Sequence, residues 1–296
     1  MIGVCLIAGM LFRRSKTLPA DAHKGINAWL IYLALPAVSF KYLPHIAWSG
    51  ALLLPALAPV IIWLGGWLYI RFYAAKTKIP VKTAAGLTLS AGLSNTSFLG
   101  FPLIAAFFGE KYIAIGVICD QVTFLLLATV GIGVAINASQ SKSLSALLFL
   151  KKIITFPPFL GCMAALTIPH FVNISVLNPL FDKLANTVGP LALFSIGLQL
   201  RFKGYKDELK RISITLLYKL ILAPALVAVV ALIFQLRGII TQVSIFEMAM
   251  PTLLSSSIIA DDYELNPQLS NLIIGIGLII GFATATMWWV VLQWFK

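Results

Sequence analysis

Charge is scarce in this chain. Only 11% of its 296 residues are charged and 60% are hydrophobic, whereas a soluble globular domain carries about 25% charged residues. Residues 51–70, 83–109 and 265–295 contain no charge at all. A helix that crosses a bilayer needs about 20 predominantly apolar residues. The composition therefore excludes an ordinary soluble domain and predicts a polytopic membrane protein.

Cysteine and histidine are also few. The three cysteines, Cys5, Cys119 and Cys162, lie singly in apolar segments, and the three histidines are far apart in the sequence. This spacing predicts neither a disulfide framework nor a metal site. The chain also lacks HExxH, a phosphate-binding loop and an ordered Ser/His/Asp set. We therefore expect no enzyme activity, no ATP-driven pumping and no cofactor.

The apolar runs predict an all-α protein with ten transmembrane helices. Their ranges are 1–12, 26–43, 51–71, 83–109, 112–136, 153–169, 184–200, 212–236, 240–260 and 270–294. The first range is short for a helix that spans the hydrocarbon core.

The net charge of +12 follows this topology rather than a nucleic-acid partner. Of the 22 basic residues, 16 lie in the odd-numbered gaps between the predicted helices, and five lie on the opposite side. Because Lys and Arg accumulate in cytoplasmic loops, both termini are expected outside the cytoplasm. The membrane itself is expected to be a bacterial inner membrane. The predicted partner is thus the lipid bilayer and not nucleic acid.

The helices also divide into two similar halves. The predicted parts are residues 1–136, a cytoplasmic connection over 137–152, and residues 153–296. Pro36 and Pro102 lie in the second and fourth helices of the first half, and Pro190 and Pro251 lie at the same places in the second. Halves of five helices must insert in opposite orientations. Inverted repeats are typical of transporters, whose site lies where the repeats meet.

The fourth and ninth helices are each interrupted near their middle. They read "SNTSFLGFPLIAAFFGE" and "FEMAMPTLLSSSIIADDYE". Proline breaks a helix but suits the first turn of a new one, so Pro102 and Pro251 could each begin a half-helix. Two half-helix N-termini meeting at mid-membrane would attract a carboxylate. The side chains expected to add hydrogen-bond donors are Asn95, Ser97, Thr252, Ser255 and Ser256. The structural alternative is a pair of simple kinks whose hydroxyls bond to their own helix.

Ionisable residues at membrane depth are functional candidates. Asp120, beside Gln121, and Glu247, four residues before Pro251, could couple transport to protons or sodium. The alternatives are a structural role for Asp120, bonded to a broken helix, and a solvent-filled vestibule around Glu247. Lys219 is expected to extend to the cytoplasmic surface rather than to bind substrate.

Four motifs resemble the auxin efflux carrier family, which includes malate and malonate permeases. They are "NTSFLGFPL" with "FFGE", "GPLALFSIGLQL", "LYKLILAPAL" and "AMPTLLSSSIIADDY", and the similarity covers nearly the whole chain. The resemblance implies ten helices in two inverted repeats, with the fourth and ninth crossing at their prolines. It implies small organic carboxylates as substrates, contacted at Asn95, Pro102 and Pro251. Auxin carriers usually have an asparagine after the second proline; residues 253–256 here are Leu, Leu, Ser and Ser, which argues against auxin.

The predicted function is therefore secondary transport of a small organic anion, such as malate or malonate, by alternating access around the crossing helices. The alternative is a passive anion channel or a membrane sensor on the same scaffold. The sequence leaves open the direction of transport, the coupling ion and a homodimeric state.

Overall fold

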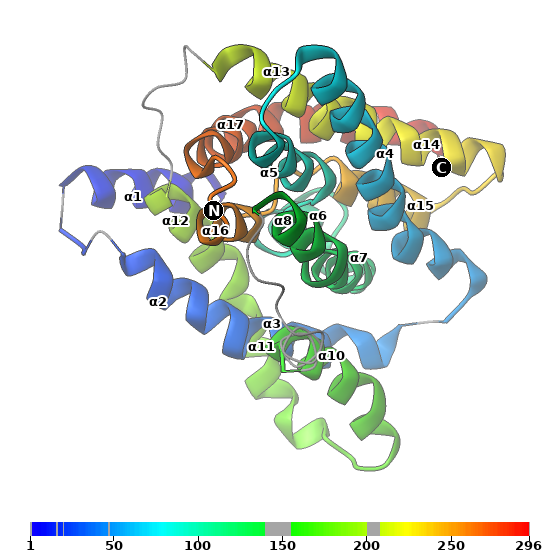
Figure 1. The fold of residues 1–296 in the computed structure, drawn as a ribbon. Coiled ribbons are helices and arrows are strands. Elements are labelled where there is room, and N and C mark those ends of the chain that lie inside the picture. The colour runs from blue at the N-terminus through cyan, green and yellow to red at the C-terminus, as the bar shows by residue number, and fades with distance from the viewer. Residues whose placement is uncertain are drawn as a thin grey trace. The chain divides into compact units, whose positions relative to one another are not determined.

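The computed structural model of the chain describes residues 2–15, 17–19, 21–46, 48–139, 155–199 and 208–295. These residues are helical over most of their length (Figure 1), and the only strand-like pairing among them is an isolated antiparallel bridge between Ser94 and Thr252. The predicted all-α class is confirmed.

Helical segments overlap each of the ten predicted ranges. Five are long and apolar enough to span a membrane: Ala22–His45, Gly50–Thr77, Glu110–Ser139, Leu209–Ile233 and Pro267–Phe295. Two further apolar helices, Thr96–Phe107 and Ile239–Met248, are shorter. This pattern is that of a polytopic membrane protein, whereas the count of ten spans and their inverted order stay predictions.

The helices pack into two compact units, each drawn from both halves of the chain. Unit 1 comprises Met1–Trp48, Ser97–Val117 and Lys151–Leu200, and unit 2 comprises Ser49–Thr96, Ile118–Leu150 and Arg201–Lys296. The boundary between Thr96 and Ser97 falls inside the interrupted fourth helix. Packing does not test the predicted repeats, and most of the predicted connection 137–152 lies outside the described residues.

Unit 1 is held together by closely packed helix pairs. Its helices are α1 (Ile2–Ser15), α2 (Ala22–Trp29), α3 (Leu35–Tyr42), α6 (Phe101–Phe107), α10 (Pro157–Thr167), α11 (Asn178–Asn186) and α12 (Val188–Gln199). α1 packs along α12, and α3 packs against α10 and α11. Gly9 and Gly197 face each other, and a Cβ atom on either would overlap the backbone of the other helix. Such small residues allow membrane helices to approach closely.

Unit 2 is built around two long helices, α4 (Leu53–Thr77) and α17 (Pro267–Leu292). Its other helices are most of α7 (Ile113–Leu126), α5 (Val81–Gly92), α8 (Ile132–Ser139), α13 (Leu209–Leu217), α14 (Ala223–Ile233), α15 (Ile239–Met248) and α16 (Ser255–Asp262). α4 packs against α5, α14 and α15, and α17 packs against α5, α13, α15 and α16. The helices α5 and α15, which lead into the two interruptions, thus both pack against α4 and α17.

Three prolines follow wider, π-helical turns. The turns Leu30–Ala34, Thr96–Gly100 and Tyr218–Leu222 end two residues before Pro36, Pro102 and Pro224, respectively. Because proline has no N–H, the carbonyl four residues earlier loses its helical partner. For Pro224 that carbonyl belongs to Leu220, and the indole Nε1 of Trp288 donates to it at 2.9 Å. The turn before Pro224 carries Lys219.

Ion pairs join segment ends that the predicted topology places on the same side. In unit 1, Lys41 Nζ lies 3.2 Å from Asp182 and 3.9 Å from Glu110, all at even-numbered gaps. In unit 2, Lys82 Nζ lies 3.0 Å from Glu264, and both residues lie in odd-numbered gaps. Each pair agrees with the predicted alternation, while the side that faces the cytoplasm stays a prediction.

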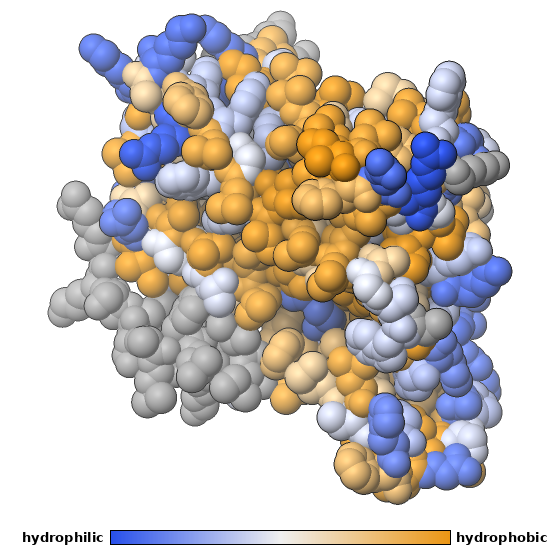
Figure 2. Space-filling view, turned by 90° about the vertical axis from the view of Figure 1, so that its right-hand side faces the viewer, coloured by the Kyte–Doolittle hydropathy of each residue, from blue (hydrophilic) through white to orange (hydrophobic). Residues whose placement is uncertain are grey.

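Apolar side chains point outward from unit 2. α14 exposes Val229, Leu232 and Ile233, and α4 exposes Leu57 and Leu64. Figure 2 shows a broad hydrophobic area on the face that includes these helices, with hydrophilic residues toward its margins. An apolar area of this extent indicates contact with lipid.

Candidate functional site

The two interruptions pair with each other inside unit 2. Residues 93–95 follow the end of α5, and residues 249–254 follow the end of α15. The amide of Asn95 donates to the Pro251 carbonyl at 2.8 Å, and the amide of Leu253 donates to the Leu93 carbonyl at 3.0 Å. A non-helical backbone at membrane depth must have its polar groups satisfied. Through these two hydrogen bonds, each interruption satisfies backbone groups of the other.

Helical backbone resumes next to this pairing in both segments. It resumes at Thr96, two residues after Ser94, and at Ser255, three residues after Thr252. Each helix start leaves backbone N–H groups without helical partners and carries partial positive charge. Pro102 is the second residue of α6, which continues the π-helical turn Thr96–Gly100, so helical backbone begins six residues before this proline. Pro251 lies in the interruption itself rather than in a helical turn, because its carbonyl pairs with the opposite segment.

Several buried polar side-chain atoms have no hydrogen-bond partner. Among the described residues, nothing hydrogen-bonds to Nδ2 or Oδ1 of Asn95, Oγ of Ser97, Oε1 of Gln121, or either carboxylate oxygen of Glu247. Asn95 is 1% exposed and Glu247 is 0% exposed. Most buried polar groups in proteins are hydrogen-bonded, so each exception calls for an explanation. A polar ligand or water at the pairing would supply one.

The two candidate acids differ in their surroundings. Thr96 Oγ1 donates to Asp120 Oδ1 at 2.6 Å, so Asp120 is bonded to the interrupted fourth helix. Glu247 is fully buried in the last turn of α15, which rules out the exposed vestibule considered for it. A carboxylate at a helix C-terminus faces partial negative charge. Glu247 is therefore the less satisfied of the two acids.

The hydroxyl candidates of the ninth helix donate to backbone carbonyls. Thr252 Oγ1 donates to the Ser90 carbonyl at 2.7 Å. Ser256 Oγ donates to the Leu253 carbonyl at 2.6 Å, while Ser255 is half-buried. A hydroxyl has a single hydrogen to donate, so Thr252 and Ser256 do not offer one to an anion in this arrangement. Asn95 is the better placed donor.

The prediction that Lys219 reaches the cytoplasmic surface is wrong. Its side chain is 0% exposed. The Nζ atom donates to Ser94 Oγ at 2.6 Å and to the Met248 carbonyl at 3.1 Å, so it touches both interrupted helices. The only signal in the sequence was an isolated lysine within an apolar run, two residues after the start of a motif that leads to Pro224.

Pro251 rests on two glycines of α17. A Cβ atom at Gly281 would lie 3.1 Å from Cγ and 3.2 Å from Cδ of the Pro251 ring, and one at Gly277 would lie 3.7 Å from its Cβ. The glycine-rich stretch of α17 thus gives space to the interruption of the ninth helix.

Valine at Gly281 is expected to push the Pro251 ring out of place. Overpacking of this kind costs about 1–3 kcal/mol, so the thermal midpoint should fall and transport should decrease. The matched control is Gly133→Val in α8, where nothing lies within 4 Å of an added Cβ. Equal melting temperatures for the two variants in detergent would show that this contact is unimportant.

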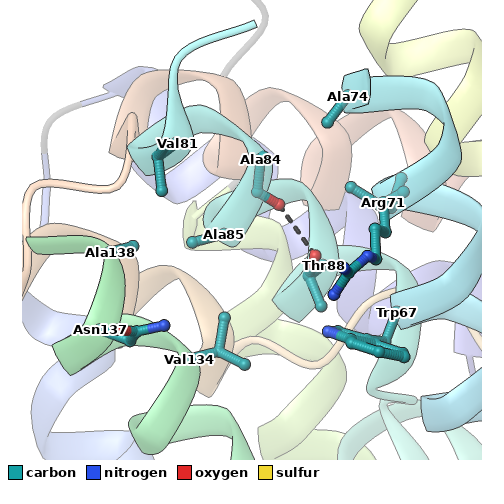
Figure 3. A pocket seen from close by; sticks show the side chains of 11 residues that line it. Trp67, Arg71, Ala74, Val81, Ala84, Ala85, Thr88, Val134, Asn137 and Ala138 are labelled. Atoms are coloured by element: carbon teal, nitrogen blue, oxygen red, sulfur yellow. Dashed lines mark hydrogen bonds between the residues drawn. The ribbon is translucent and has the colours of Figure 1, made fainter. Parts of the chain in front are cut away.

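A second candidate site is an open pocket of about 230 Å³ between α4, α5 and α8 (Figure 3). Apolar side chains form most of its wall, and Arg71 is the one charged residue that lines it. The guanidinium carbon of Arg71 lies 5.3 Å from the ring centroid of Trp67, and Asn137 offers an amide on the opposite side. The pocket borders the N-terminal part of α5, whose other end leads into the paired interruptions. From the sequence, Arg71 was interpreted only as one of the basic residues that indicate which loops face the cytoplasm.

The described residues contain no group of three or more His, Cys, Asp or Glu side chains that could hold a metal ion. His45 and His170, far apart in the sequence, do line one pocket of about 370 Å³ in unit 1.

Comparison with known proteins agrees with a transport function. Residues 1–289 match the family described as "Membrane transport protein". An "Uncharacterized transporter" of Methanothermobacter thermautotrophicus is 22% identical over 294 residues, which cover 98% of this chain and 95% of the relative. A "Putative malonate transporter" of Rhizobium meliloti is 24% identical over 297 residues, covering 95% and 90%. The family match spans nearly all of the chain and confirms the resemblance seen in its motifs: the chain belongs to the auxin efflux carrier family of membrane transport proteins.

Proposed function

We propose that the protein is a secondary carrier of a small organic anion, with a carboxylate such as malate or malonate as substrate. The observation that carries this proposal is Asn95, whose buried amide has no partner and lies at the pairing of two interrupted membrane helices. The relative described as a "Putative malonate transporter" supports the substrate class.

A carboxylate suits this site because the site offers hydrogen-bond donors and partial positive charge. The buried ammonium nearby, that of Lys219, is already bonded to protein oxygens. Asn95 Nδ2 has two hydrogens to donate, and the helix starts at Thr96 and Ser255 add backbone N–H groups and partial positive charge. Ser97 and Ser255 are further donors on the same segments, and Gln121 can contact a substrate hydroxyl through Oε1. Pro102 and Pro251 would disfavour a continuous helix through each of the two segments.

Transport would proceed by alternating access of this site to the two sides of the membrane. Glu247 is the first candidate for coupling, because a buried carboxylate without a partner is costly to keep ionised and would take up a proton when access changes. The charged and titratable groups around it are Asp120 and Cys119 of α7 and Lys219 of the turn before α14. Asp120 and Gln121 would complete the coupling site.

Replacing Glu247 by glutamine is expected to remove the pH dependence of uptake. The amide keeps the shape of the side chain but cannot gain or lose a proton. Uptake by proteoliposomes over a range of external pH would show a flat profile for Glu247→Gln, and we expect a smaller change for Asp120→Asn. Asp261→Asn, on an exposed residue, is the control. A wild-type profile in Glu247→Gln would remove Glu247 from the coupling mechanism.

The protein would lie in a bacterial inner membrane with both termini outside the cytoplasm, as a monomer or a homodimer. The competing function is a passive anion channel or a sensor, which would use the same paired interruptions without alternating access.

The substrate class is tested by a thermal-shift screen of the purified protein against mono- and dicarboxylates. A ligand present at one hundred times its Kd stabilises a protein by about 2.7 kcal/mol, so malonate or malate should raise the melting temperature by several degrees. Chloride and sulfate at equal ionic strength are the controls. Stabilisation by none of the carboxylates would contradict the proposed substrate class.

A further inference from the structure

The ammonium group of Lys219 lies at the ends of α5 and α15, the helices that lead into the two interruptions. Its two hydrogen bonds reach Ser94, just after α5, and the carbonyl of Met248, the last residue of α15. The side chain is completely buried. Lys219 is thus the one described lysine that joins both interruptions, and it does so at their C-terminal helix ends rather than at the helix starts near Asn95.

This position has the chemistry of a monovalent cation site. The last carbonyls of a helix lack helical partners and carry partial negative charge. Carbonyls at the ends of interrupted helices hold sodium ions in several transporters. Here a carbonyl oxygen and a hydroxyl oxygen contact the ammonium, and the carboxylate of Glu247 lies within electrostatic range of it.

We propose that the Lys219 ammonium is a tethered cation that occupies this position permanently. Neither the folding of the paired interruptions nor transport by the protein then requires sodium. The inference rests on the proposed function where it concerns transport. The sequence left open whether transport is coupled to sodium or to protons. Because the Lys219 ammonium already fills the cation position beside the paired interruptions, the proton is left as the coupling ion.

The charges near Lys219 support the same choice. The Lys219 ammonium interacts electrostatically with the Glu247 carboxylate, and Glu247 in turn interacts with Asp120. One negative charge is therefore left over when all three groups are ionised. A single proton neutralises it. Lys219 has three N–H donors and gives two of them to protein oxygens, so its main task is structural rather than the capture of a substrate carboxylate.

The test is thermal unfolding of the purified protein, without substrate, in sodium chloride and in choline chloride at equal ionic strength. We expect the wild-type melting temperature to be the same in both salts. Lys219→Ala should melt roughly 5–15 °C lower in choline, as expected when one partner of a buried charge cluster is removed. Sodium or ethylammonium, which are small enough to enter the vacated position, should restore part of this loss, and Lys219→Arg should need neither.

Lys76→Ala, on an exposed residue of α4, is the control and should behave as wild type in every salt. A wild-type protein that sodium stabilises over choline would overturn the proposal, and that measurement needs no variant. The proposal would also be overturned if neither sodium nor ethylammonium stabilised the Lys219→Ala protein, whether the cation is added to the purified protein in detergent or is present throughout purification. Because no substrate is present, a failure of the carboxylate assignment cannot produce either result.

Discussion

Alanine at Asn95 is expected to weaken carboxylate binding about 10- to 150-fold, the equivalent of one hydrogen bond to a charged group. The side-chain amide is buried at the pairing of the interrupted helices and has no protein partner. Its hydrogen-bonding capacity is therefore unused until a ligand arrives. Titration of malonate into purified protein, followed by thermal shift or calorimetry, measures the change.

The same variant separates a binding role from a structural one. Removing a buried polar group that has no partner should leave stability unchanged or raise it, because its desolvation is no longer a cost. We therefore expect Asn95→Ala to melt at or above the wild-type temperature while it loses affinity. Asn271→Ala, on an exposed residue of α17, is the matched control and should keep wild-type affinity. A variant at Asn95 that melts lower but binds normally would show that the amide is structural.

Replacing both Pro102 and Pro251 by alanine is expected to abolish transport and to leave most of the fold intact. Alanine restores an N–H and a normal helical turn, which favours continuous helices over the interruption and disperses the two helix starts. The backbone pairing of Asn95 with Pro251 and the packing of Pro251 on Gly281 would then be lost. Helix content by circular dichroism should stay near the wild-type value.

The control for the double variant is Pro59→Ala, a buried proline inside the continuous helix α4. It should retain transport, because no helix start depends on it. Normal uptake by the double variant would contradict the role given to the paired interruptions.

Much of the fold could be predicted because the length and hydropathy of a membrane-spanning helix are set by the lipid bilayer and not by its neighbours. A run of uncharged residues predicts a helix wherever it packs, and each predicted range contains one. The pairing of the interruptions was also foreseeable, since "NTSFLGFP" and "AMPTLLSSS" carry prolines and small polar residues at matching places. Their hydrogen bonds were not, because the registers of two non-helical segments depend on the packing around them.

Lys219 shows why the rest could not be predicted. Its distance along the chain from the helix end suggested a side chain that reaches water. The π-helical turn Tyr218–Leu222, set by Pro224 and capped by Trp288, directs it inward instead. Thr252 and Ser256 show the same limit: their residue type predicts a donor, but only the backbone geometry decides that the donor is used locally. The two units, each assembled from both halves of the chain, follow from long-range packing that no local pattern records.

Counterflow of labelled malonate in proteoliposomes tests the central claim most directly. A carrier that alternates access should accumulate external labelled malonate transiently when the vesicles contain unlabelled malonate. Its initial rate should saturate with concentration, and Asn95→Ala should lose both properties. A flux that rises linearly with concentration and ignores the internal malonate would contradict a carrier and indicate a channel.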